Sequence, residues 1–179
     1  HHDTHIANID KYKNAHVCVE QATSTCRLLY SKNKSLINTL NQNQKLLILM
    51  ADDYDSYQFK VPSSYEINVL LWSLTGDRFG KFTDMFKEGF AGFNQQQQNI
   101  INLYANKLNR VLSQLEVYSA VIPIKGETYN MCSTFASECI NDVADHMLSN
   151  YKSDVVMVVN TKSSKVSFRK SKKCELDLS

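Results

Sequence analysis

Apolar residues recur at helical spacing over much of the first two thirds of the chain. This spacing predicts a helix after residues 23–25, whose hydroxyl groups suit a helix cap, a second helix after residues 62–64, and a long amphipathic helix over residues 100–115. Between them, the apolar stretch 46–50 runs directly into the acidic segment 51–55. Carboxylates at the end of a buried element often form a site in α/β proteins, although a solvated helix end gives the same pattern.

The pattern changes near residue 117. Residues 117–124 are typical of a strand, residues 133–151 carry apolar positions at helical spacing, and residues 155–159 form an apolar run that a polar turn separates from another strand. We therefore predict an α/β protein in three parts. These are a first domain over residues 1–93, a connector helix over residues 94–116 and a smaller α+β domain over residues 117–179.

The composition is that of a globular protein. With 43% hydrophobic residues, five Gly and two Pro among 179 residues, the chain is neither disordered nor collagen-like, and the fold should be rich in helix. The net charge of +2 excludes a global polycation, so a phosphate site must come from local clustering. Because the five cysteines lack C-x-x-C spacing and there is no apolar run of about 18 residues, we expect a cytoplasmic protein with no membrane partner.

Positive charge clusters near the end of the chain. Six of the twelve residues 162–173 are basic, and none of the twelve is acidic. The six are Lys162, Lys165, Arg169, Lys170, Lys172 and Lys173. Such a strip suits phosphate binding, and lysines that protect the exposed edge of a hairpin give the same pattern.

The first residues of the chain, His1, His2, Asp3 and His5, combine imidazole and carboxylate groups. These groups together suit ions of the Mn, Fe, Zn or Mg type. The remnant of a polyhistidine tag would also begin a chain in this way. The motifs that follow along the chain help to decide between a metal site and a tag.

Three motifs follow one another along the chain. It begins His-His-Asp-Thr, a Ser/Thr-led helix follows at residues 22–30, and residues 55–59 read Asp-Ser-Tyr-Gln-Phe. Their order, and the similarity of residues 55–59 to an Asp-Thr-x-x-Phe element, resemble the pattern of the DHH phosphoesterases. The chain thus resembles this family, whose signature Asp-His-His lies at a two-metal site. The resemblance implies that His1 and Asp55 ligate the same ion, that Asp55 ends a core strand, and that Asp53 is the runner-up for Asp55.

The resemblance extends to the C-terminal hairpin, which in the family belongs to a small substrate-binding domain and ends in Ser-x-Arg-Ser. Here the hairpin ends in residues 167–171, with Lys170 inserted before the last serine. The residues that the resemblance implies for binding the substrate phosphate are Ser167, Arg169, Lys170 and Ser171. His2 would face that phosphate as a hydrogen-bond donor or proton-transfer group, and Asp3 and His5 would orient the metal ligands.

The resemblance implies an enzyme that hydrolyses phosphodiesters in short oligonucleotides or linear dinucleotides with two divalent ions. Manganese is the expected metal, and magnesium or cobalt would also suit the residue types. A single-strand exonuclease and a pyrophosphatase or polyphosphatase of the same family are further alternatives. A non-catalytic nucleic-acid-binding or scaffold protein that uses the basic hairpin is the alternative from another class.

Some motifs of the family have no counterpart in the chain. The N-terminal Asp-x-Asp element, the second Asp element and the Gly-Gly-Gly-His element would lie beyond the two ends, and the Asp of the signature would stand immediately before His1. The chain therefore resembles an excerpt that is truncated at both ends, and we expect the 179 residues alone to be inactive. The sequence leaves a homodimer open.

Overall fold

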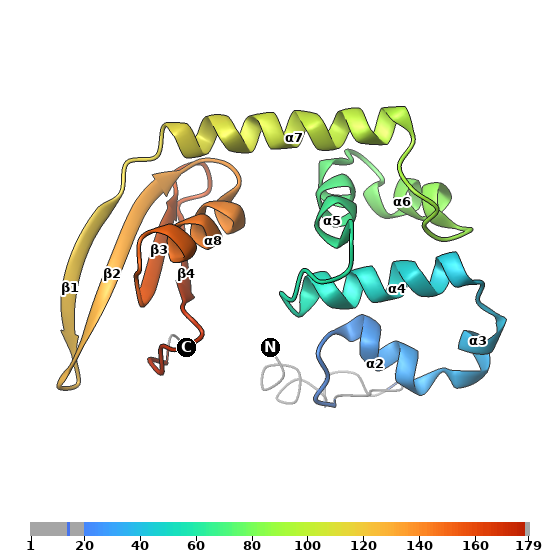
Figure 1. Cartoon of the computed structure of the whole chain (residues 1–179), viewed down its shortest axis with the longest axis horizontal. Coiled ribbons are helices and arrows are strands. Elements are labelled where there is room, and N and C mark those ends of the chain that lie inside the picture. Colours follow the sequence, from blue (N-terminus) through green and yellow to red (C-terminus); the bar gives the residue numbers. More distant parts are fainter. Residues whose placement is uncertain (1–13, 15–19, 178–179) are drawn as a thin grey trace. The chain divides into compact units, whose positions relative to one another are not determined.

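The computed structural model describes residues 14 and 20–177, and the chain divides into two compact units (Figure 1). Unit 1 covers His1–Ile101 and unit 2 covers Asn102–Ser179. The first helices are α2 (Thr25–Lys32), α3 (Lys34–Thr39), α4 (Gln42–Asp55), α5 (Ser64–Ser73) and α6 (Arg78–Phe86), and α7 (Gln95–Ser113) spans the division. The remaining elements are β1 (Tyr118–Ile124), β2 (Glu127–Ala136), α8 (Ile140–Asn150), β3 (Val155–Asn160) and β4 (Lys165–Lys170).

Helices and a four-stranded mixed sheet confirm the α/β class. Residues 20–101 contain helices and no strand, so the β-structure of the described residues lies entirely in unit 2. The long helix predicted over residues 100–115 is confirmed as α7, and the hairpin predicted after residue 155 is confirmed as β3 and β4. Within the described part of the chain, no helix combines the length and apolar character needed to span a bilayer.

Local capping explains where the first helices begin. The Ser24 side chain accepts a hydrogen bond of 3.0 Å from the Arg27 amide, which confirms the predicted cap of α2. Asn41 and Gln44 form a reciprocal capping box at the start of α4, with distances of 2.9 and 3.0 Å. These bonds satisfy amides that a helix start otherwise leaves without acceptors.

Residues 46–55 lie in α4, so the expectation that Asp55 ends a core strand is wrong. A short apolar run does not distinguish a strand from a buried helix. Here the run consists mostly of Leu and Met, which favour helices, and the capping box starts the helix before the run begins. The carboxylates of residues 52–55 therefore stand on the last turn of a helix.

The core of unit 1 lies where α4 meets α5 and α6. Met50, Ile67, Leu70 and Phe86 are buried there, and partly buried phenylalanines pack around them. Gly89 follows α6 with a φ of +87°, and a Cβ built on it would come within 2.1 Å of the backbone of Asn43 and Gln44. Only glycine permits this close approach, which brings the Phe90 amide to 3.0 Å from the Asn43 carbonyl.

The sheet of unit 2 has the strand order β1-β2-β3-β4. The outer pairs β1/β2 and β3/β4 are antiparallel, and the central pair β2/β3 is parallel. A parallel pair needs a crossover connection, and α8 supplies it between β2 and β3. The two hairpins are thus joined into one sheet through a single helix.

The helix predicted over residues 133–151 is correct only in its second part. Residues 133–136 continue strand β2, and α8 begins at Ile140. Burial alternates along the end of β2, where Cys132, Thr134 and Ala136 are buried and the residues between them are not. This period of two is the signature of a strand. The four-residue spacing between Phe135 and Cys139 fits a helix, but Phe135 belongs to β2 and Cys139 precedes α8.

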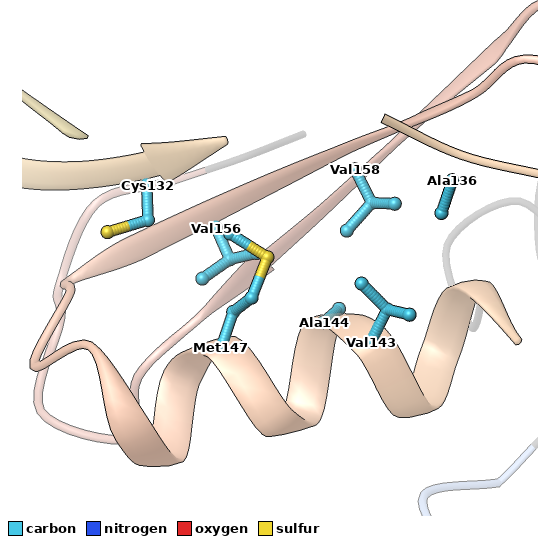
Figure 2. Close-up of a cluster of buried hydrophobic side chains, with 7 residues drawn as sticks. All are labelled: Cys132, Ala136, Val143, Ala144, Met147, Val156 and Val158. Atoms are coloured by element: carbon cyan, nitrogen blue, oxygen red, sulfur yellow. The ribbon is translucent and has the colours of Figure 1, made fainter. Parts of the chain in front are cut away.

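The core of unit 2 lies between α8 and one face of the sheet. Figure 2 shows the side chains of β2 and β3 meeting those of α8 in this layer. The buried set is Cys132, Ala136, Val143, Ala144, Met147, Val156 and Val158. Partly buried residues of the last turns of α7, Val111 and Leu112, pack against the same cluster.

Replacing a core valine of this layer should destabilise unit 2. Val158 is fully buried, and Val158→Ala should lower the free energy of unfolding by about 2 kcal/mol through lost apolar burial and a residual cavity. Val121, on strand β1, is 63% exposed, so Val121→Ala should cost less than about 1 kcal/mol. Urea denaturation followed by circular dichroism measures both, and equal losses would contradict the described packing.

Candidate functional site

The residues singled out from the sequence fall into three groups. His1, His2, Asp3 and His5 lie outside the described residues. Asp53 and Asp55 stand on the last turn of α4 in unit 1. The phosphate-binding candidates at residues 167–171 lie on and just after β4 in unit 2.

Asp53 closes the loop between α4 and α5. Its buried carboxylate accepts hydrogen bonds from the Lys60 amide at 2.9 Å, the Val61 amide at 3.2 Å and the Ser64 hydroxyl at 2.7 Å. Burial alone would raise the pKa of Asp53, but the bonds from Ser64 and the two amides outweigh it and lower the pKa. Because both carboxylate oxygens are engaged by the protein, Asp53 fits a structural role better than that of a metal ligand.

Asp52 ties α2 to α4, and the sequence analysis did not single it out. One of its carboxylate oxygens accepts bonds from the Thr23 hydroxyl at 2.8 Å and the Ser24 hydroxyl at 2.6 Å. Ser24 therefore donates to Asp52 while it caps the start of α2. The hydroxyl residues before α2 were the available signal, but their distant acceptor cannot be read from local spacing.

Asp55 is the carboxylate of this turn that suits a cation. Burial, followed by the charge of Asp52, raises the pKa of Asp55, and no hydrogen bond from a described residue to its carboxylate is present. The pKa of the nearby Cys26 thiol is raised by burial and then by Asp55 and Asp52. A cation would relieve this local excess of negative charge. Among the described residues, however, no group of three or more His, Cys, Asp or Glu side chains could hold a metal ion.

Four aromatic rings surround the loop that follows Asp55. The ring of Phe59 contacts those of Tyr54, Tyr57 and Tyr65, with centroids 5.7, 5.8 and 6.4 Å away and in edge-to-face geometry. Tyr57 and Phe59 have φ values of 52° and 51°, in the left-handed region that bulky residues rarely adopt. The ring contacts and the bonds to Asp53 hold this backbone in place.

Ser167 and Arg169 lie together on one face of the edge strand β4. They are two residues apart and pair with Val158 and Val156, which point toward α8, so they share the α8 face. Arg169 Nη2 donates to Asn141 Oδ1 at 3.0 Å, which places its guanidinium beside the first turn of α8.

The other two phosphate candidates are placed differently. Lys170 alternates to the opposite face of β4, and its Nζ donates to the Leu176 carbonyl at 2.8 Å. Ser171 follows the strand, and its amide donates to the Asp154 carbonyl at 2.8 Å. The strand thus brings Ser167 and Arg169 together and separates Lys170 from them.

Charged groups of both signs surround the first turn of α8. Lys107 Nζ lies 2.8 Å and Arg110 Nη2 lies 3.9 Å from the Glu138 carboxylate. The bond from Lys107 lowers the pKa of Glu138, and the charges of Lys107, Arg110 and Lys162 lower it further, whereas desolvation of the carboxylate raises it. Three cations therefore converge just before α8. Glu138 neutralises part of this positive charge.

A second polar cluster joins Tyr104 of α7 to Asp142 of α8. The Tyr104 hydroxyl donates to Asp142 at 2.6 Å, and burial followed by this bond raises the pKa of Tyr104. Burial also raises the pKa of Asp145, against the lowering effect of Arg169, while Asp142 raises it further. Asn141 and Asp145, one helical turn apart on α8, thus both interact with the guanidinium of Arg169.

Comparison with known proteins gave no match: no protein-family model, no curated protein and no solved structure matches the chain. The resemblance to the DHH phosphoesterases therefore stays a prediction that is carried by the order of its motifs.

The role of Asp53 can be tested against that of its neighbour Asp55. Asp53→Ala removes the acceptor of two backbone amides, so hydrogen exchange at Lys60 and Val61 should become faster. Asp55→Ala, on the same helical turn, should leave these two amides protected. The measurement is residue-resolved hydrogen exchange by NMR, and unchanged protection in Asp53→Ala would show that its carboxylate does not hold the loop.

Proposed function

We propose that the protein is a cytoplasmic, metal-dependent phosphodiesterase that acts on short oligonucleotides or linear dinucleotides. The observation that supports this most directly is the pairing of Ser167 and Arg169 on one face of β4. A hydroxyl and a guanidinium on alternate residues of a strand can bind oxygens of the same phosphate group. The cations that converge on Glu138 add positive charge nearby.

Arg169 is suited to bind rather than to react. Its guanidinium is planar, always charged and able to bind a phosphate through two parallel hydrogen bonds. The bond to Asn141 orients this group before substrate arrives, so less side-chain entropy is lost on binding. Ser167 would donate its hydroxyl to a further phosphate oxygen.

The metal chemistry would use Asp55 together with the histidines at the start of the chain. An oxygen donor from Asp55 and a nitrogen donor from His1 suit manganese, and magnesium or cobalt would also be accepted. When bound, two divalent ions activate a water and neutralise charge on the attacking and leaving oxygens. His2 would donate a hydrogen bond or a proton to the substrate phosphate, and Asp3 and His5 would orient the ligands.

A non-catalytic nucleic-acid-binding protein is the second candidate. The observation that favours it is the exposed basic strip on and around the edge strand β4, where Lys162, Lys165 and Lys173 are all exposed. Phosphate contacts of this kind supply affinity without any chemistry. Metal-dependent turnover separates the two candidates.

The hydrolytic function is tested with the protein as expressed from its own gene. With manganese, it should hydrolyse a linear dinucleotide, and His1→Ala and Asp55→Ala should each reduce kcat by at least about a hundredfold, because each removes a metal ligand. Asp84→Ala, which removes an exposed carboxylate of α6, serves as the control and should retain activity. Full activity of both ligand variants would refute the assignment, provided that circular dichroism shows them folded.

The role of Arg169 predicts a separate kinetic signature. Arg169→Ala should raise KM for the dinucleotide by about 10- to 150-fold, the equivalent of one charge-assisted hydrogen bond, with a smaller effect on kcat. Lys125→Ala removes one positive charge at the turn between β1 and β2 and should leave KM unchanged. A fall in kcat at constant KM would place Arg169 in the chemical step instead.

A further inference from the structure

The face of the sheet that is turned away from α8 carries exposed aromatic rings. Since Cys132, Val156 and Val158 point toward α8, the residues that alternate with them point to the opposite face. Strand register aligns one row across the four strands and a second row across the last three. The first row is Tyr118, Ser133, Met157 and Phe168, and the second is Phe135, Val159 and Val166.

Three rings on this face are accessible to solvent. Tyr118 is 53%, Phe135 is 62% and Phe168 is 48% exposed. The rings of Tyr118 and Phe135 lie 6.4 Å apart between centroids and at 83° to each other. Met157 and Val159 lie between these rings and Phe168 and are only partly buried. A continuous apolar surface of this kind, when it is bordered by polar residues, marks a binding surface.

We propose that this face binds single-stranded nucleic acid, with bases stacked on Phe135 and Phe168. Every base has an aromatic face, so exposed aromatic rings on a sheet bind successive bases with little sequence preference. Phe135 and Phe168 are on strands two positions apart, which separates them by roughly 10 Å across the sheet. That separation leaves room for a different base on each ring.

The distribution of charge around the sheet indicates where the phosphates of a bound nucleic acid would lie. Lys162 lies in the turn before β4, and Lys172 and Lys173 lie just after its end, all of them exposed. On the opposite edge, the Tyr118 hydroxyl is bonded to the carboxylate of Glu116 at 2.9 Å. The sugar-phosphate backbone therefore runs along the β4 edge, where the lysines neutralise it, and not along β1.

The same charges disfavour a second copy of the chain as the occupant. A second copy of the chain would add the same lysine-rich hairpin and no complementary negative charge, so charge complementarity does not favour a symmetric dimer. A polyanion gains from the same arrangement. The chemistry of the surface therefore matches single-stranded nucleic acid better than another copy of this protein.

This surface is separate from the phosphate site of the proposed enzyme. Phe168 points to one face of β4, whereas Ser167 and Arg169 point to the other. Binding to the aromatic face therefore needs neither metal nor hydrolysis and does not depend on the proposed function. The two can be tested independently.

The test is fluorescence anisotropy of a fluorescein-labelled 12-nucleotide oligo(dT) in EDTA, where metal-dependent turnover cannot occur. The double variant Phe135→Ala/Phe168→Ala should bind more weakly by about 5- to 150-fold for each stacked base that is lost. Val121→Ala removes an exposed apolar side chain that alternates to the α8 face and should bind as the wild type does.

Two further variants guard against an unfolded protein. Phe135→Leu/Phe168→Leu keeps apolar side chains but removes the flat rings, and it should lose affinity with an unchanged circular dichroism spectrum. Lys172→Ala/Lys173→Ala should reduce the salt dependence of binding, whereas the leucine variant should not. Wild-type affinity of the leucine variant, or a dimer in light scattering that the leucine substitutions dissociate, would overturn the proposal.

Discussion

The four-stranded sheet of unit 2 is packed by one complete helix, and a single helix can cover only one of its faces. α8, together with the last turns of α7, buries the face that carries Val156 and Val158. This layer contains the fully buried side chains of the unit, so its stability depends on it. The opposite face keeps its aromatic rings in contact with solvent as a direct consequence. One packing constraint thus yields both the core and the surface that is available for binding.

Unit 1 depends on a comparable constraint, which is polar. Asp53 accepts three hydrogen bonds from the loop before α5 and from Ser64, and Asp52 joins the start of α2 to the end of α4. Buried carboxylates need such donors, because an unpaired charge in the interior is costly. Adjacent residues on one helical turn therefore have different roles: two are engaged by the protein, and Asp55 remains able to meet a ligand.

Much of the fold could be predicted where the signal is local. The hairpin of β3 and β4, the cap at Ser24 and the long helix α7 each follow from spacing within a few residues. The resemblance implied that Asp55 ends a core strand, but residues 46–55 lie in a helix, and a short apolar run does not by itself distinguish the two. The candidate site was predictable to the same extent. Asp53, Asp55, Ser167 and Arg169 could be chosen from the sequence by residue type, but their partners could not, because these lie farther along the chain. The donors to Asp53 come from residues 60–64, and the partner of Arg169 is Asn141.

Both proposed surfaces depend on the register in which β4 pairs with β3. A shift of one residue would move Ser167 and Arg169 to the aromatic face and Phe168 to the α8 face. The turn before β4 opposes such a shift, since Asn160 Oδ1 accepts bonds from the amides of Lys162 and Ser163 at 3.0 and 3.2 Å. Ser164, with a φ of 53°, completes the turn. A polar turn of four residues therefore sets the register in which one six-residue strand presents Ser167 and Arg169, the pair proposed to bind phosphate, on one face and the ring of Phe168 on the other.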